Sequence, residues 1–223
     1  MISTTILPAL GDNCPGLILA QLQCKLVNTD FNKELWQEIK QTQAEIKDNY
    51  SFDTVKQQPN IAATRKAYKS CGKDPNRYRP SAESLYRRIV KGNDLYQINT
   101  LVDLVNLFSL QTGYSIGGFD ADFIEGSITA GVGRKDEPYE GIGRGALNIE
   151  GLPVLRDDKG GIGTPTSDEV RTAIRLETTH FFMNVNAYLG MNGIDKFLNK
   201  TKSYLQKYVA ATEIQLNFIQ YLK

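Results

Sequence analysis

The stretch SAESLYRRIVKGNDLYQINTLVDLVNLFSLQTGYSIGGFDADFIEG, residues 81–126, carries clear signals of secondary structure. A first helix is expected to begin near Ser81, directly after a proline, and to stop at Gly92. A second helix is expected to begin after Asn99, a residue type that caps helix N-termini, and to end at Gly113. Because apolar residues occupy almost every side of this second helix, we expect it to be buried.

Upstream of this stretch, the sequence predicts one strand. Apolar and polar residues alternate over residues 18–26, which is the period of a strand with two different faces. Gln21, Gln23 and Lys25 form the face opposite to the apolar one.

Two more helices are expected between this strand and residue 81. Asp30 is expected to cap a helix whose apolar residues recur at helical spacing as far as Ile46. Trp36, the single tryptophan, is expected to face the core from this helix. Another helix is expected from about Ile61 to Cys71.

Downstream of residue 117 the pattern of residues changes from long helical segments to short runs. Many glycines and short apolar runs, to about residue 155, fit short strands joined by turns. Residues 170–177 alternate with a strand period, residues 181–190 predict another strand, and the tail from residue 194 predicts a helix. The chain is therefore predicted to be one α+β domain over residues 1–223, with a mixed or antiparallel sheet core flanked by helices.

The composition limits the classes of function that the chain can have. Of 223 residues, 41% are hydrophobic and 23% are charged, which is ordinary for a globular protein. The formal net charge is only +1, so affinity for nucleic acid must come from a local patch. There is no secretory signal pattern and no run long enough for a membrane helix, so no membrane partner is expected. Cys14, Cys24 and Cys71 lack zinc-like spacing and favour a reduced, cytoplasmic compartment, and Cys24 is expected to be a buried, inert thiol.

Familiar catalytic sites are missing. His180 is the only histidine, and it falls in an expected strand, where a structural role is expected. A Ser-His-Asp site would need this residue, and histidine-rich metal sites are excluded. We expect no metal and no cofactor.

The stretch GGIGTPTSDEVR, residues 160–171, has three interpretations. It could cradle a phosphate, activate a serine, or turn the chain through its own threonine and serine side chains. It lacks the lysine that follows the second glycine of a P-loop, which argues against nucleotide binding of that kind.

Basic residues interleaved with tyrosines crowd the region from residue 65 to residue 91. Such side chains suit contacts with RNA phosphates and bases. The alternative is a solvated helical face with a structural network of arginines and carboxylates. The RNA-binding candidates are Arg77, Arg79, Arg87 and Arg88.

With these segments in order, the sequence resembles the B3/B4 domain of the phenylalanyl-tRNA synthetase beta chain, and more closely the free-standing proteins built from that domain. The resemblance covers about residues 15–210. One match is LRDDKGGIGTPTSD, residues 155–168, which is similar to the family's aspartate-rich turn and glycine loop. The family's helical pattern and its Phe-Asp pair correspond to Arg88, Ile98, Val102, Asp103, Asn106, Phe119 and Asp120.

The resemblance implies an editing module that receives the aminoacylated 3′ end of tRNA and hydrolyses a wrongly attached amino acid. An aminoacyl ester is already activated, so a positioned water and donors for the developing oxyanion suffice. Asn106 and Ser167 are then the catalytic candidates, and the glycine loop is a pocket wall. The substrate-binding candidates are Gly163, Thr164, Thr166, Gly117 and Gly118.

Three departures from the family pattern affect substrate choice. The family's pocket histidine falls on Gly117, its Thr-Asn pair becomes Val105-Asn106, and its glycine-loop glutamate aligns near Pro165, with Glu169 the nearest acid. Two hypotheses remain: a trans-acting deacylase of mischarged aminoacyl-tRNA, and a catalytically inactive module that binds RNA or an amino acid. Independent ligase activity is not expected, because the chain carries no ATP-binding aminoacylation domain of that family.

Overall fold

A computed structural model of the protein describes residues 1–191 and 193–222. The α-helices are α1 Pro8–Gly11, α2 Lys33–Asn49, α3 Pro59–Ser70, α4 Ser81–Val90, α5 Thr100–Thr112 and α6 Ile194–Val209. Short 3-10 helices are η1 Val55–Gln57, η2 Ala121–Phe123 and η3 Val170–Thr172.

Most strands form two four-stranded sheets. The first contains β2 Ile18–Lys25, β3 Ile116–Asp120, β9 His180–Ala187 and β10 Thr212–Gln220. Its order is β10-β2-β9-β3, and all neighbours are antiparallel. The second contains β1 Thr4–Ile6, β4 Ile128–Val132, β7 Pro153–Asp157 and β8 Gly160–Gly163. Its order is β1-β4-β7-β8, with β1 parallel to β4 and the other pairs antiparallel. A small hairpin pairs β5 Glu140–Gly141 with β6 Gly145–Ala146.

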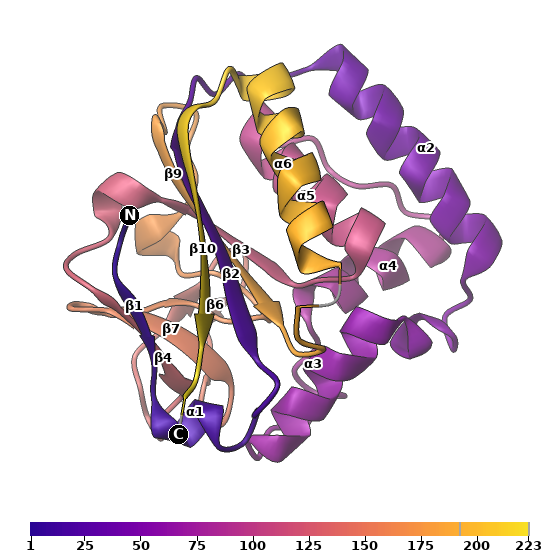
Figure 1. The fold of residues 1–223 in the computed structure, drawn as a ribbon. Coiled ribbons are helices and arrows are strands. Elements are labelled where there is room, and N and C mark those ends of the chain that lie inside the picture. The colour runs from indigo at the N-terminus through magenta and orange to yellow at the C-terminus, as the bar shows by residue number, and fades with distance from the viewer. Residues whose placement is uncertain (192, 223) are drawn as a thin grey trace.

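These elements stack in layers (Figure 1). Helices α2, α5 and α6 cover one face of the first sheet, and the second sheet lies on its other side. One hydrophobic cluster fills the space between the helices and the first sheet, and another lies between the two sheets. The expected α+β class, with mixed and antiparallel sheets flanked by helices, is confirmed.

The central helix α5 forms as its sequence predicts. The Asn99 side chain accepts a hydrogen bond from the Val102 N–H at 3.0 Å, which satisfies one of the free donors of the first turn. Gly113 ends the helix with a left-handed φ of 74°, which glycine adopts without a steric penalty. Between these caps most residues are buried, so α5 packs on several sides at once.

The strand β2 is buried on both faces. Ile18, Ala20 and Leu22 face the helices, as the alternation predicts. The face expected to be polar lies against the second sheet, so Gln21 is fully buried. Its side-chain amide donates to Asn184 Oδ1 at 3.0 Å, which offsets part of the cost of removing it from water.

Residues 170–177 do not form the expected strand. Residues 170–172 form η3 instead, and Glu169 caps this turn by accepting a hydrogen bond from the Arg171 N–H at 2.7 Å. The Arg171 guanidinium also donates to both carboxylate oxygens of Asp157, at 2.8 and 2.9 Å. These side-chain contacts hold the segment beside the end of β7, so it does not extend into a ladder.

The expected boundaries of two helices need correction. Asp30 does not cap α2; the cap is Asn32, whose side chain accepts from the Leu35 N–H at 3.1 Å. The tail is helical only to Val209, because Ala210 takes a left-handed φ of 48° and ends α6. The chain then reverses direction and forms β10, which pairs antiparallel with β2. The sequence predicted only a helix for this tail and no strand.

Candidate functional site

A cleft of about 410 Å³ opens between α4, α5, β3 and the loop after β8. Its walls are mainly apolar, with a few polar groups, which is the usual character of a site for a small organic ligand. Its polar side chains are Ser81, Ser84, Asn106, Ser109, Arg144, Thr164, Thr166, Ser167 and Asp168.

Helix α5 places Asn106 in this cleft. The side-chain amide of Asn106 forms no hydrogen bond within the described part of the chain, so it is free to bind a ligand. Asp103, one turn earlier, has a structural role: it accepts from Trp36 Nε1 at 2.7 Å and from the Ile98 N–H at 3.1 Å. This bond also ties Trp36 to the core, as expected for the single tryptophan.

The N-terminus of α4 anchors the glycine loop. The Ser81 N–H donates to the Pro165 carbonyl at 2.7 Å, and the Ala82 N–H donates to Ser115 Oγ at 3.3 Å. Two of the free N–H groups that every helix start carries are thus used to fix one side of the cleft.

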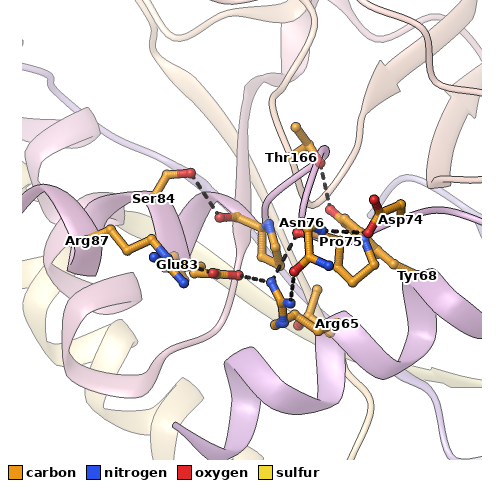
Figure 2. Close-up of polar contacts among 12 residues, drawn as sticks. Arg65, Tyr68, Asp74, Pro75, Asn76, Glu83, Ser84, Arg87 and Thr166 are labelled. Carbon is orange, nitrogen blue, oxygen red and sulfur yellow. Dashed lines mark hydrogen bonds and ion pairs between the residues drawn. The ribbon is translucent and has the colours of Figure 1, made fainter. Parts of the chain in front are cut away.

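The loop itself is held by its own side chains. Thr164 Oγ1 accepts from the N–H groups of Thr166 and Ser167, both at 3.2 Å, and donates to the Ser167 carbonyl at 3.0 Å. Thr166 Oγ1 pairs with the Tyr68 hydroxyl at 2.8 Å, which connects the loop to α3 (Figure 2). The self-held turn and the pocket wall are therefore both present, since the same residues line the cleft.

Ser167 has no histidine base. Its hydroxyl oxygen lies 3.3 Å from the carbonyl oxygens of both Ile142 and Asp168, and its one proton can be donated to either of them. His180 lies at the start of β9 and pairs through Nδ1 with Asp122 at 2.9 Å, which gives it the expected structural contact. A Ser-His-Asp mechanism is not assembled by these residues.

Asp168 is a cleft residue that the sequence does not predict. Its side chain lines the cleft, and its Oδ2 accepts a hydrogen bond from the Gly118 N–H at 3.1 Å. Burial raises the pKa of Asp168 to about 8, and the Gly118 hydrogen bond opposes this rise only in part. Glu169, the acid expected to be nearest, instead caps η3 and does not line the cleft.

Gly117 and Gly163 lie behind the cleft rather than in it. They line a small chamber of about 10 Å³ with Ser115 and Asn184, which is about the room that one water molecule needs. An added Cβ at Gly117 would lie 2.7 Å from Cζ of Phe119, and one at Gly163 would lie 2.6 Å from the same atom. Both glycines are therefore required by the close packing of this buried ring.

The hairpin of β5 and β6 brings a cation, Arg144, to the cleft, and the sequence did not predict this either. Its connecting residues, 142–144, bring Ile142 and the exposed Arg144 to the cleft, and Gly143 makes the turn with a φ of 67°. The glycines of this segment predict a turn in the chain. Only the tertiary structure places Arg144 beside the cleft.

The basic region divides into structural and free arginines. Figure 2 shows Arg65 and Arg87 reaching the buried Glu83 from two helices; each guanidinium donates to one carboxylate oxygen at 2.8 Å. Arg88 stacks on the Tyr96 ring, 3.9 Å from its centroid, and donates to a backbone carbonyl. Two of the four RNA-binding candidates, Arg87 and Arg88, are thus held by contacts within the fold.

Arg77 and Arg79 remain available. Both are exposed on the loop between α3 and α4, and neither forms an ion pair within the described residues. Arg77 lies near the Tyr78 ring, at 5.8 Å from its centroid. The same loop is anchored beneath by Arg65, which donates to Asn76 Oδ1 at 2.6 Å and to the Pro75 carbonyl at 3.0 Å.

Some classes of site find no support in the described residues. No group of three or more His, Cys, Asp or Glu side chains there is arranged to hold a metal ion. In the same residues, no helix combines the length and the apolar character that crossing a membrane requires. Cys24 is buried, and burial raises the pKa of its thiol to about 12, in keeping with the expected inert role.

The protein thus has an α+β fold in which a cleft lies between helices and a glycine loop. Residues 63–203 match the family model described as the B3/4 domain, and since this is more than half of the chain, the chain belongs to the B3/4 domain family.

One solved structure aligned with the chain is the crystal structure of an N-terminal fragment of the phenylalanyl-tRNA synthetase beta-subunit from Pyrococcus horikoshii, with 13% identity and a TM-score of 0.49. That alignment covers 99% of this chain and 55% of that one, so the chain spans about half the length of the fragment. No curated protein matches this chain.

Proposed function

We propose that this chain is a trans-acting deacylase that hydrolyses the ester of mischarged aminoacyl-tRNA. The observation that carries the proposal is that Asn106 lines the same cleft as Thr164, Ser167 and the acid Asp168, which lie on one loop far from Asn106 in sequence. Membership of the B3/4 domain family also supports the proposal of a deacylase.

The cleft supplies what ester hydrolysis needs. Its apolar walls exclude water from the amino-acid side chain, which orients the ester at the polar groups. Asn106 has a free amide, which can donate to the carbonyl oxygen as negative charge develops there or can position the attacking water. The ester is activated by its own leaving group, so this reaction needs no cofactor and no covalent serine intermediate.

The test is loss of the ester from a panel of tRNAs that carry cognate and non-cognate amino acids, including tyrosyl-tRNA of the phenylalanine type. Asn106→Ala is expected to lower the rate of hydrolysis about 100-fold, the usual effect of removing one oxyanion donor. Asn49→Ala, at the end of α2 and outside this cleft, is the matched control and should retain the full rate. Equal rates for the two variants would remove Asn106 from the mechanism.

A second candidate is a binding module without catalysis. It is favoured by the loop's internal hydrogen bonds, because the N–H groups of Thr166 and Ser167 are taken up by Thr164 and are not aimed at a ligand. This candidate predicts that aminoacyl ligands raise the melting temperature without any turnover. A folded protein that is stabilised in this way, yet hydrolyses none of the panel, would establish it.

The tRNA backbone is proposed to contact Arg77 and Arg79 rather than Arg87 and Arg88. The double substitution of Arg77 and Arg79 by Ala is expected to weaken tRNA binding about tenfold and to reduce the salt slope of log K by about 1–2. Removing two cations from α2, Lys33 and Lys40, controls for net charge and should leave the salt slope unchanged. An unchanged slope in the Arg77/Arg79 variant would place the tRNA elsewhere.

A further inference from the structure

The side chain of Asp168 has no cationic partner in the described residues. Its Oδ2 accepts the Gly118 N–H, and the structure gives the side chain no other hydrogen bond and no ion pair within residues 1–191 and 193–222. It lines both the cleft and the small chamber behind it, so it stands where a ligand in the cleft would meet it. An isolated carboxylate shielded from water is costly, and a ligand that supplies the opposite charge would offset this cost.

The charged and titratable groups near Asp168 form no ion pair with it in the described residues. On the same loop, Glu169 is engaged by the Arg171 N–H, and the Arg171 guanidinium is paired with Asp157. From the segment before β5, the Tyr139 hydroxyl donates to the Ser167 carbonyl at 2.7 Å, and burial raises its pKa well above the usual value, so it is neutral. The exposed Arg144 lies on the hairpin that borders the cleft.

The other elements around Asp168 bring no charge to it. Strand β3 offers Gly117 and Gly118, strand β8 offers Gly163, and helix α5 offers the neutral amide of Asn106. Asn184, on β9, is neutral as well.

We propose that Asp168 recognises a primary ammonium group, so that the cleft accepts acyl groups with a free α-amino group and rejects N-blocked ones. This inference rests on the proposed function and names the part of the substrate that the site reads. The apolar walls would hold the side chain of the amino acid, Asn106 would face the ester, and Asp168 would pair with the ammonium group beside it.

Binding then moves one proton. In the empty site the carboxyl carries its proton at about pH 6.5, since burial raises its pKa to about 8. When the ammonium enters, the carboxyl loses this proton to solvent, and the resulting carboxylate accepts a charge-assisted hydrogen bond from the ligand N–H. Above about pH 8 the carboxyl is already ionised, so release of the proton disappears.

The probes are adenosine analogues in which a 3′-amide replaces the ester, carrying an alanyl, leucyl or phenylalanyl group, each with a free or an N-acetylated amine. Binding is measured by calorimetry at about pH 6.5 in two buffers of different ionisation enthalpy, which gives the number of protons released. The free-amine probe that binds best is expected to bind at least about tenfold more tightly than its acetylated partner and to release close to one proton.

Asp168→Asn is the test variant, and Glu169→Gln, the adjacent acid outside the cleft, is the control. Asp168→Asn should bind both probes equally and release no proton, whereas Glu169→Gln should behave like the unsubstituted protein. The folded state keeps a proton at Asp168 that the unfolded chain loses above its ordinary pKa of 3.8, so stability falls from about pH 4 to about pH 8. Asp168→Asn removes this fall and should fold at least as stably at about pH 7.

The outcomes separate the two proposals. Equal affinity of the free and acetylated probes for the unsubstituted protein would overturn ammonium recognition and leave the deacylase proposal standing. Retained discrimination in Asp168→Asn would also overturn it, because another group would then read the amine. If no probe of the panel binds, both the aminoacyl site and this inference fall.

Discussion

Replacing Glu83 by Ala is expected to lower the free energy of unfolding by about 3–5 kcal/mol, the usual cost of breaking a buried ion pair by removing one partner. The Glu83 carboxylate is fully buried, and Arg65 and Arg87 each donate to it at 2.8 Å with side chains only 14% and 15% exposed. Without it, two guanidinium groups lose their partner in a place that water reaches poorly. The midpoint of urea unfolding measures the loss.

Two control variants sharpen this result. Glu125→Ala removes a carboxylate whose ion pair with Lys159 is about half exposed, and it should change stability by less than about 1 kcal/mol. Glu83→Gln keeps the volume and one acceptor but not the charge, so its effect should fall between the two. If Glu83→Ala costs no more than Glu125→Ala, these arginines are not held by the carboxylate, and the basic region is a surface feature.

Phe119→Ala is also expected to cost about 3–5 kcal/mol, because the ring is fully buried between the two sheets and leaves a cavity when it is removed. Gly117→Ala alone should cost about 1–3 kcal/mol, because the new Cβ would lie 2.7 Å from Cζ and 2.9 Å from Cε2 of that ring. Urea unfolding of the single variants and the double variant gives the coupling between the two positions.

The double variant is expected to be less destabilised than the sum of the single variants, by about 1–2 kcal/mol, because the Cβ of residue 117 enters the space that the ring has left. Gly16→Ala is the control for glycine itself. An added Cβ there would meet only the Tyr188 carbonyl oxygen at 3.4 Å, so the change should stay within about 0.5 kcal/mol. Strict additivity of Gly117→Ala and Phe119→Ala would contradict the close packing that explains this glycine.

The candidate site could be predicted in part. Asn106 and the threonines of the glycine loop were expected to lie in one pocket, and they line the same cleft. Asp168 and Arg144 could not be selected, because an acid in a turn and an arginine in a hairpin are ordinary surface residues until other segments surround them. Of the four RNA-binding candidates, Arg87 and Arg88 are held by Glu83 and Tyr96, which fits the alternative of a structural network for these two.

The sequence by itself determined the features that depend on local energetics. The caps of α5, the stop of α4 before Gly92 and the inward stripe of β2 follow from side chains a few residues apart, so a single sequence contains the information. Only the tertiary structure decided that the second face of β2 is covered, that the chain after Val209 returns as a strand, and that Asp168 faces a cleft. Each of these results depends on segments distant in sequence removing a side chain from water or supplying a ladder partner, and no local pattern encodes which segment will do so.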